Sequence, residues 1–344
     1  MILLVVGLIL AGFYCYGLGS GGTFYHQLVK APFAPAIDAP YYRASLLHVA
    51  LGHVLGLGGA ILMFRLMVLA CFWAALFYLG RVVRGRLAWT DGCLVLWVLM
   101  FHPSAMIAYT WTCHPDALTY LLTAMLLFSR RPWFVGIVAA LGAWNHLAMW
   151  VIVCVEAALL WWAFLGMDAK RPVIATAIGL ALGAVTCKLT LMACGIEIGS
   201  DRLALATGQD LGVLVGYWTE AGWPVLYTLY FAHLLWLPAV MVGLYRERPR
   251  RMFALGATQL LALGATFCAQ DTTRVFAFLA WGPLMYGLVH VLETTGEGPR
   301  RAAYVRPLVC VAIVASMVSP KIFAWKGDIR DTGPARAQLR GLLF

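Results

Sequence analysis

The chain consists of apolar runs of about 15–22 residues that recur from Met1 to Pro320 between short polar breaks. A helix of roughly 20 apolar residues crosses the hydrocarbon core of a bilayer, which is about 30 Å thick. The runs do not alternate with a period of two, as the strands of a membrane barrel do. The pattern therefore predicts an all-α, polytopic integral membrane protein with about eleven transmembrane helices.

The predicted transmembrane helices lie near residues 2–18, 60–80, 90–107, 116–129, 132–148, 149–167, 172–194, 223–245, 252–268, 273–292 and 307–320. A further helix over 42–57 is expected at the outer surface. Because no internal repeat divides the chain, we expect a single transmembrane domain over residues 1–320 and a short C-terminal tail over 321–344. The outer loops 19–59 and 195–222 are long enough to hold a site.

Composition agrees with a membrane protein. Hydrophobic residues make up 62% of the chain and charged residues 12%, and the mean hydropathy is +0.83. Soluble domains carry about 25% charged residues. The net charge of +10 does not indicate a nucleic-acid partner, because the basic residues lie in short clusters between apolar runs and form no continuous patch.

The positions of the basic residues predict the orientation in the membrane. With a cytoplasmic N-terminus, the inner loops hold the basic clusters at 81–86, 130–131, 170–171, 246–251 and 300–306. The outer loops before the tail hold Lys30, Arg43, Arg202 and Arg274. This asymmetry follows the positive-inside rule. We expect a multi-pass protein of the bacterial inner (plasma) membrane with its C-terminus in the periplasm, although the tail is itself basic.

Ionisable side chains at membrane depth are costly, so each is examined as a functional candidate. The inner acids are expected to be solvated loop charges beside basic clusters; they are Asp91, Asp168, Glu247, Glu293 and Glu297. Glu156 and Lys188 lie within apolar runs and are a candidate pair. The outer acids differ, because they stand among histidines, aromatic residues and arginines.

The first outer candidate is Asp38, in the string APFAPAIDAPYYRASLLH. Prolines fix φ and hold such a segment in one shape without a sheet or a long helix. Tyr41 and Arg43 follow it and would contact a substrate beside the acid. The alternative is an interfacial anchor, with tyrosine and arginine at the level of the lipid headgroups.

The second candidate lies in AYTWTCHPDALTYLL, where His114 and Asp116 precede an apolar run. Aromatic rings beside carboxylates are a common way to bind sugars, because they offer contact to the apolar C–H faces of the sugar and hydrogen bonds to its hydroxyl groups. The alternative is simple capping, because the helix dipole stabilises an acid at a helix N-terminus. Asn145 and His146 fall at a tight outer turn between two predicted spans, and there the alternative is a buried, hydrogen-bonded pair.

The third candidate is the string AQDTTRVF, in which Asp271 and Arg274 stand three residues apart and share a helical face. Either they form a local ion pair, or Arg274 receives a phosphate, to which the planar guanidinium is suited. No HExxH, GxSxG, Walker A or GxGxxG motif is present. A metal site assembled from His114, Asp116 and His146 is a further alternative.

Four pieces of the sequence together resemble the polytopic glycosyltransferases of the GT-C superfamily. They are PYYRASL after a long outer loop, HPDALTYLL after an aromatic loop, NHLAMW in a span pair, and DTTRVFAFLAWGPL at the start of a late span. The chain departs from that family in one respect, because the loop GLGSGGTFYHQLVK after the first span holds no acid and Asp38 is the first one.

The resemblance implies a GT-C-like fold and transfer of a hexose or pentose from a polyprenyl-phosphate donor. The acceptor would be a lipid-linked, glycan or protein hydroxyl group on the non-cytoplasmic face of the cell envelope. Asp38 or Asp116 would be the catalytic base, Arg274 and Arg43 would hold the phosphate, and a divalent cation such as Mg²⁺ or Mn²⁺ would assist the leaving group.

Two other classes of function remain open on the sequence. The first is a transporter or flippase for a lipid-linked or anionic solute, which Glu156 and Lys188 favour because both lie at membrane depth. Against this class, the chain shows no repeat, and most of its polar residues lie at the outer face. The second is a non-catalytic membrane assembly factor.

Overall fold

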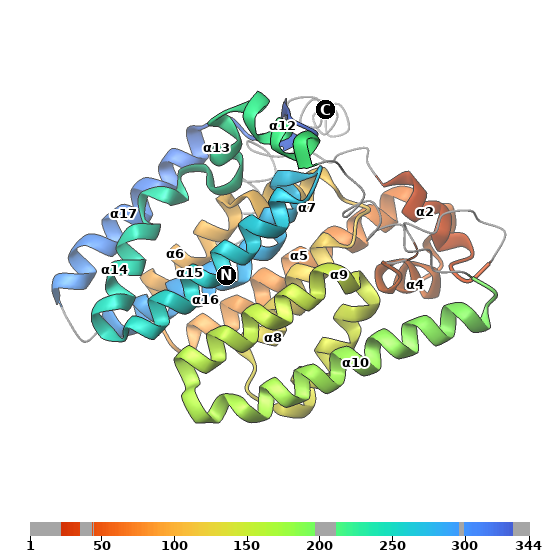
Figure 1. The fold of residues 1–344 in the computed structure, drawn as a ribbon, viewed down its shortest axis with the longest axis horizontal. Coiled ribbons are helices and arrows are strands. Elements are labelled where there is room, and N and C mark those ends of the chain that lie inside the picture. The colour runs from red at the N-terminus through yellow and green to blue at the C-terminus, as the bar shows by residue number, and fades with distance from the viewer. Residues whose placement is uncertain (1–21, 35–42, 44, 197–210, 296–298, 333–344) are drawn as a thin grey trace. The chain divides into compact units, whose positions relative to one another are not determined.

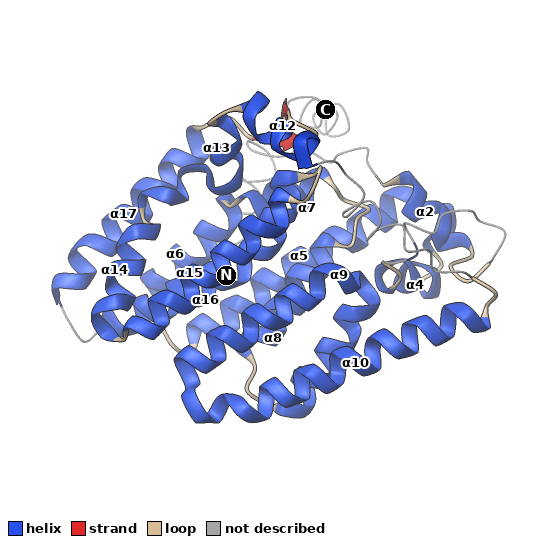
Figure 2. Cartoon of the chain, in the orientation of Figure 1, coloured by secondary structure: helices blue, strands red, loops and turns tan. Residues whose placement is uncertain are grey.

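A computed structural model describes residues 22–34, 43, 45–196, 211–295 and 299–332 of the 344-residue chain (Figure 1). The predicted helix over 2–18 lies outside these residues, as do Asp38 and Tyr41. The described chain is almost entirely helical and carries two short strands near its end (Figure 2).

The helices are α2 (Thr23–Lys30), α4 (Leu47–Val54), α5 (Ile61–Arg84), α6 (Trp89–Phe101), α7 (Pro103–Thr110), α8 (Asp116–Phe128), α9 (Pro132–Leu165), α10 (Lys170–Ala193), α12 (Leu211–Ala221), α13 (Pro224–Tyr230), α14 (Leu237–Glu247), α15 (Pro249–Phe267), α16 (Thr272–Thr295) and α17 (Pro299–Val318). Short 3₁₀ turns are η2 (Leu57–Gly59), η3 (Gly166–Ala169) and η4 (Phe231–Leu235). The strands are β1 (Ile322–Trp325) and β2 (Asp328–Asp331).

The chain is a membrane protein by the length and composition of its helices. Among the described residues, three helical stretches are long and apolar enough to cross a membrane, namely Ile61–Arg84, Pro132–Ala193 and Thr272–Thr294. The number rises to five if each of two bent helix pairs is one span. The all-α prediction therefore holds for the spans, while the predicted number of about eleven stays a prediction.

By its internal contacts the chain divides into two compact units, each of which is considered by itself. Unit 1 comprises Leu76–Thr110 and the described residues of Asp210–Phe344. Unit 2 comprises the described residues of Ser20–Ala75 and of Trp111–Gln209.

In unit 2, α9 is two helices joined by a break at His146, where φ is −165° and ψ is 73°. The second helix folds back on the first, so that the indole Nε1 of Trp150 donates to the carbonyl of Ala139 at 2.9 Å. The break falls within the predicted turn between spans 132–148 and 149–167. The predicted position of Asn145 and His146 at a tight turn is therefore confirmed.

Helix α10 packs closely against the first half of α9 because both present small residues four apart. A Cβ added at Gly179 would lie 2.0 Å from the carbonyl oxygen of Gly136, and one added at Gly183 would lie 2.4 Å from that of Ala140. Membrane helices approach in this way where packing rather than the hydrophobic effect drives their association. This close packing joins α9 and α10 within unit 2.

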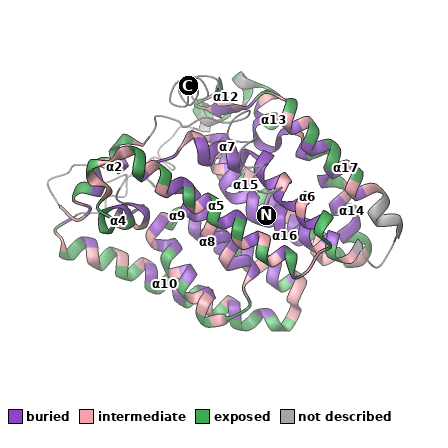
Figure 3. Ribbon diagram, turned by 180° about the vertical axis from the view of Figure 1, so that it is seen from behind, coloured by how far each residue is buried: buried purple, intermediate pink, exposed green. Residues whose placement is uncertain are grey.

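In unit 1, two predicted spans are broken. The predicted helix 90–107 is α6 and α7, bent by 51° at His102, whose backbone is extended because proline follows it. The predicted helix 223–245 is α13, η4 and α14, bent by 57°. Of the three long apolar stretches described above, the one in α16 is the most enclosed, with 89% of its apolar window buried (Figure 3).

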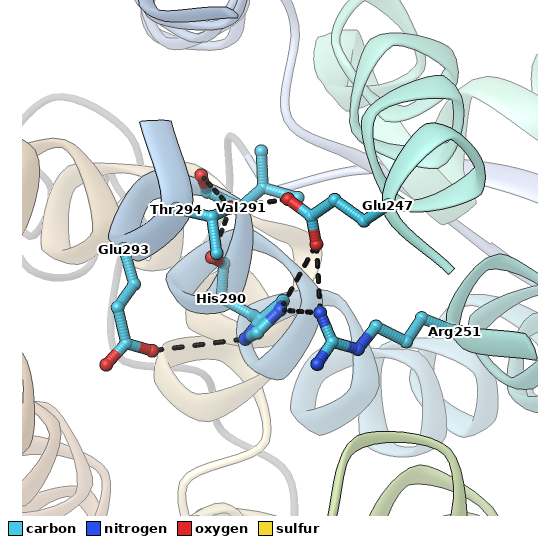
Figure 4. A network of polar contacts seen from close by, with 6 residues as sticks. All are labelled: Glu247, Arg251, His290, Val291, Glu293 and Thr294. Atoms are coloured by element: carbon cyan, nitrogen blue, oxygen red, sulfur yellow. Dashed lines mark hydrogen bonds and ion pairs between the residues drawn. The ribbon is translucent and has the colours of Figure 1, made fainter. Parts of the chain in front are cut away.

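Two of the inner acids are not the solvated loop charges that the sequence predicts. Asp91 is buried and accepts two hydrogen bonds from Arg306, at 2.7 and 2.6 Å. The side chain of Glu247 is 11% exposed and accepts from Arg251 at 3.0 Å and from Thr294 at 2.7 Å (Figure 4). Each acid joins two or more helices of unit 1, because a buried carboxylate needs charged or polar partners.

The same network includes His290 and Glu293. Because arginine has only donors, the Nε2 atom of His290 accepts from Arg251 Nη1 at 2.7 Å. Its Nδ1 atom lies 3.9 Å from a carboxylate oxygen of Glu293 (Figure 4). The network connects α14, α15 and α16 at the ends where the sequence predicts the cytoplasmic side.

The predicted C-terminal tail begins with a β-hairpin. β1 and β2 pair antiparallel, with Ile322 opposite Asp331 and Trp325 opposite Asp328. The two connecting residues, Lys326 and Gly327, both have positive φ, as two-residue hairpin turns require. The dipeptide Lys326-Gly327 is the local sequence signal of this hairpin, which is not among the predicted elements.

Candidate functional site

The candidate site of unit 2 is centred on the turn that precedes α8. The backbone N–H of His114 donates to the carbonyl of Trp111 at 3.0 Å, which closes the turn. Asp116 is the first residue of α8 and is 2% exposed. An acid in this position is stabilised by the helix dipole, in agreement with the capping alternative. Its burial beside a polar turn is what keeps it a candidate for chemistry.

Asn145 joins the turn within α9 to the start of α8. Its side-chain amide is fully buried and donates to the carbonyl of Pro115 at 3.0 Å and to the hydroxyl of Thr119 at 2.7 Å. Thr119 also donates its hydroxyl to Pro115 at 3.0 Å. The alternative of a buried, hydrogen-bonded residue is therefore correct for Asn145, and the bonds place it one residue from Asp116.

Aromatic and histidine rings pack around the same turn. The ring of Tyr25 lies 4.8 Å from that of His48 and 5.1 Å from that of His114, edge to face in both cases. The ring of Trp111 lies 5.0 Å from that of His114. His48 Nε2 lies 3.2 Å from the carbonyl of Cys113 and donates to it. Three separate segments of the chain thus contribute rings to this cluster.

Gly22 packs against the turn that precedes α8, and Arg43 is buried in the segment that leads to α4. A Cβ added at Gly22 would lie 2.3 Å from the Cβ of Cys113, so only glycine allows this approach. Arg43 is 5% exposed and its guanidinium donates to the carbonyl of Ala34. The backbone N–H of Leu46, three residues on, donates to the carbonyl of Trp144 at 2.9 Å.

We call the residues that these contacts bring together the outer cluster of unit 2, after the side of the membrane that the sequence predicts for them; they are Gly22, Tyr25, His48, Trp111, His114, Asp116, Thr119 and Asn145. Three of these residues, His114, Asp116 and Asn145, are site residues that the sequence predicts. Trp111 stands in the same aromatic loop as His114, and its ring packs against that histidine. Tyr25 is not among the predicted site residues, because its contact with His114 joins segments distant in the sequence. Asp38 and Tyr41 lie outside the described residues and stay predictions.

Asp271 and Arg274 belong to unit 1. Their side chains are 16% and 14% exposed, and Arg274 Nη1 lies 3.3 Å from Asp271 Oδ2. The local ion pair that the sequence analysis gave as the alternative is therefore formed. The following threonines bind the β-hairpin, since Thr272 donates to the carbonyl of Ala324 at 3.0 Å and Thr273 accepts from its N–H at 2.8 Å.

Two further hypotheses from the sequence do not hold. His114, Asp116 and His146 form no metal site, because the described residues contain no group of three or more His, Cys, Asp or Glu side chains placed to hold an ion. The described ion pairs also do not join Glu156 to Lys188. Both carboxyl oxygens of Glu156 are buried and bond to no described residue.

Comparisons with known proteins support the fold only. No protein-family model matches the chain, and no curated protein matches its sequence. Among solved structures, the chain is similar to the cryo-EM structure of the arabinofuranosyltransferase AftD from Mycobacteria, with a TM-score of 0.51 and 16% identity. The match covers 92% of this chain and 26% of that chain, so this chain spans about a quarter of the length of AftD.

Proposed function

We propose that the chain is a membrane glycosyltransferase that transfers a sugar from a polyprenyl-phosphate donor to a lipid-linked, glycan or protein acceptor. Transfer would take place on the non-cytoplasmic face of a bacterial inner membrane. The observation that carries the proposal is the outer cluster of unit 2, in which a buried acid stands at a helix N-terminus among tyrosine, tryptophan and histidine rings. The fold likeness to an arabinofuranosyltransferase supports the same class.

The chemistry is a single displacement at the anomeric carbon. The carboxylate of Asp116, or of Asp38, takes the proton of the acceptor hydroxyl. The acceptor oxygen forms its bond to the anomeric carbon while the bond from that carbon to the phosphate oxygen breaks. The polyprenyl phosphate leaves with the electron pair of the broken bond. The anomeric centre is inverted, and the proton stays on the carboxyl group until solvent removes it.

The leaving phosphate needs positive charge near it. Arg274 and Arg43 are the outer arginines proposed for this role, because a guanidinium presents a planar fork of donors to phosphate oxygens. A divalent cation such as Mg²⁺ or Mn²⁺ would be held mainly by the donor's phosphate, since such ions bind through few carboxylates and substrate oxygens. The bilayer is the second partner, because the donor's polyprenyl chain stays within it.

The test is transfer by the full chain in proteoliposomes. A polyprenyl-phosphate arabinofuranose is the first donor to try, followed by the corresponding hexose donors. We expect Asp116→Asn to lower the rate by about 10²–10⁴-fold, the usual contribution of a positioned base. Asp168→Asn, an exposed acid in η3, is the matched control and should keep the full rate. Full activity of folded Asp116→Asn and of folded Asp38→Asn would contradict the assignment of the base.

A specific observation in unit 1 favours transport as a second candidate. The rings of His102 and His233 stack 5.3 Å apart, and both are fully buried. His102 lies at the break of one bent helix pair, and His233 lies in η4, three residues before the break of the other. Broken helices with polar groups at membrane depth line the sites of many transporters. If proteoliposomes move the polyprenyl-phosphate sugar across the bilayer without transferring the sugar, and His233→Phe stops this, the transporter or flippase replaces the enzyme. A chain that does neither fits the third class, an assembly factor.

A further inference from the structure

A two-part groove lies between the end of α5 and the start of α6, within unit 1. Its two hollows have volumes of about 200 and 230 Å³. The residues that line both hollows are Gly80, Arg84, Trp89, Cys93 and Leu96. Because five residues are shared, the hollows adjoin, and Arg84 stands where they meet.

The walls of the groove are apolar apart from two arginines. One hollow continues along Phe77 and Trp97, and the other along Val83, Leu87, Ala88 and Gly92. Arg81 lies one helical turn before Arg84, and both side chains are exposed at the mouth. An apolar groove with cations at its opening matches an amphipathic anion.

No carboxylate of the described chain neutralises these two arginines through an ion pair. The acid nearest in sequence, Asp91, is already held by two hydrogen bonds from Arg306. An ion pair with an acid of the described chain therefore does not explain why Arg81 and Arg84 stand at the mouth of an apolar groove. A negatively charged group from outside the protein would complete the arrangement.

The groove also lies where lipid headgroups are expected. Helix α5 has 24 residues, and at 1.5 Å per residue it is about 36 Å long, so its two ends lie near the two surfaces of a bilayer. Arg81 and Arg84 stand in its last turn. Trp89 is 61% exposed, and tryptophans gather at the boundary between hydrocarbon and headgroups.

We propose that this groove binds one anionic glycerophospholipid. Its phosphate lies against Arg84 and Arg81, and its two acyl chains enter the two hollows on either side of Arg84. A free phosphate would use the arginines but not the hollows, and a neutral lipid would use the hollows but not the arginines. The inference does not rest on the proposed enzymatic function.

The test uses the full chain in nanodiscs of phosphatidylcholine that contain phosphatidylglycerol with a photoactivatable acyl chain. Mass spectrometry of peptides then locates the crosslinks. We expect adducts on the peptides that hold Phe77 and Cys93. Removing both charges (Arg81→Gln with Arg84→Gln) should lower their yield about tenfold, because charge-assisted contacts to the phosphate are lost. Arg130→Gln with Arg131→Gln removes another predicted inner pair and should change nothing.

A second variant tests the hollows without touching the charges. Gly80→Leu would fill the shared part of the groove, and its Cβ would meet only Leu96, at 3.7 Å. Leucine is a better helix former than glycine, so α5 should stay folded. We expect this variant also to lose the phosphatidylglycerol adducts while it keeps the charge of the mouth.

Three results would overturn the proposal. Equal yields with photoactivatable phosphatidylcholine would show that the charge of the headgroup is irrelevant. Loss of adducts on addition of millimolar inorganic phosphate would show that the arginines bind a free anion. A crosslink from Cys93 to residues 2–18, with no lipid adduct, would show that the chain's own N-terminal segment fills the groove.

Discussion

Asp116 in unit 2 and Asp271 in unit 1 both stand at the start of an apolar helix, and their electrostatic surroundings differ. Asp271 lies 3.3 Å from Arg274 on the next turn, so its negative charge is compensated within its own helix. Helix α8 carries no basic residue, and Asp116 has the helix N-terminus and the neighbouring amide of Asn145 beside it. Asp116, buried at a helix N-terminus beside aromatic and histidine rings, is therefore the candidate for proton transfer, and Arg274, with its fork of donors, is the candidate for holding an anion.

The two helix starts are also held in different ways. In unit 2, side chains from distant segments enclose the turn, and Tyr25 contacts His48 and His114 across the sequence. In unit 1, two threonine hydroxyls bind the backbone of the β-hairpin at Ala324. A cluster of interlocking rings depends on close packing, whereas the hairpin junction depends on a few hydrogen bonds. Substitutions should therefore lower the free energy of unfolding more in the ring cluster of unit 2 than at the hairpin junction of unit 1.

The largest effect is expected at Gly22, where φ is +81° and the Cβ of alanine would lie 2.3 Å from Cys113. Gly22→Ala combines a strained backbone with overpacking, so the free energy of unfolding should fall by about 2–4 kcal/mol. Thermal unfolding in detergent measures the loss, and peptide mapping after maleimide treatment should show that the buried thiol of Cys113 becomes reactive.

Gly56→Ala is the matched control for this prediction. Gly56 has φ +69° and no atom within 4 Å of an added Cβ, so alanine there meets backbone strain alone, about 1–2 kcal/mol. Equal losses in the two variants would mean that the close approach of Gly22 to the outer cluster does not stabilise unit 2.

The next effect is expected at Asn145, whose amide makes two buried hydrogen bonds. Asn145→Leu leaves the hydroxyl of Thr119 and one lone pair of Pro115 without their donor, which should cost about 2–3 kcal/mol. Thr186→Val removes the exposed bond from Trp144 near the same turn and should cost less than about 1 kcal/mol. If Asn145→Leu lowered the free energy of unfolding less than Thr186→Val does, Asn145 would not be the residue that links α8 to α9.

Much of the helical pattern follows from the sequence, because run length and apolar composition determine which segments enter a membrane. The turn at Asn145 was predictable, since two apolar runs meet there without room for a loop. The bends at His102 and Trp236 were not predicted, because hydropathy continues across them. Pro103 was the visible sign at the first bend, since the residue before a proline avoids helical backbone.

The candidate site was predictable in part. His114, Asp116 and Asn145 were chosen for their residue types near the outer ends of spans, and they meet around one turn. Tyr25 and His48 could not be assigned to that turn, because their contacts with it depend on packing between segments distant in sequence. Asp38 lies outside the described residues, so its role as the alternative base stays a prediction.

A smaller effect is expected at the hairpin junction of unit 1. Thr273→Val leaves the N–H of Ala324 without its acceptor and removes the bond that the hydroxyl of Thr228 accepts, which should cost about 1–2 kcal/mol. Thr219→Val, in which the hydroxyl bonds only within its own exposed turn of α12, is the control and should be nearly neutral. If the two variants unfold at the same temperature, the hairpin is not held by Thr273.

The smallest effect on stability, and a separate one on activity, is expected at Arg274. Its pair with Asp271 joins residues three apart at a distance of 3.3 Å, so Arg274→Gln should cost about 1 kcal/mol. If Arg274 holds the donor's phosphate, the KM for a polyprenyl-phosphate sugar should rise about tenfold while kcat changes less, because the bond is made in the ground state as well as in the transition state. Arg330→Gln breaks an exposed pair with Asp328 in the hairpin and should change neither quantity. A KM that stays constant in Arg274→Gln would leave Asp271 and Arg274 as a structural pair and would place any phosphate contact in unit 2, at Arg43.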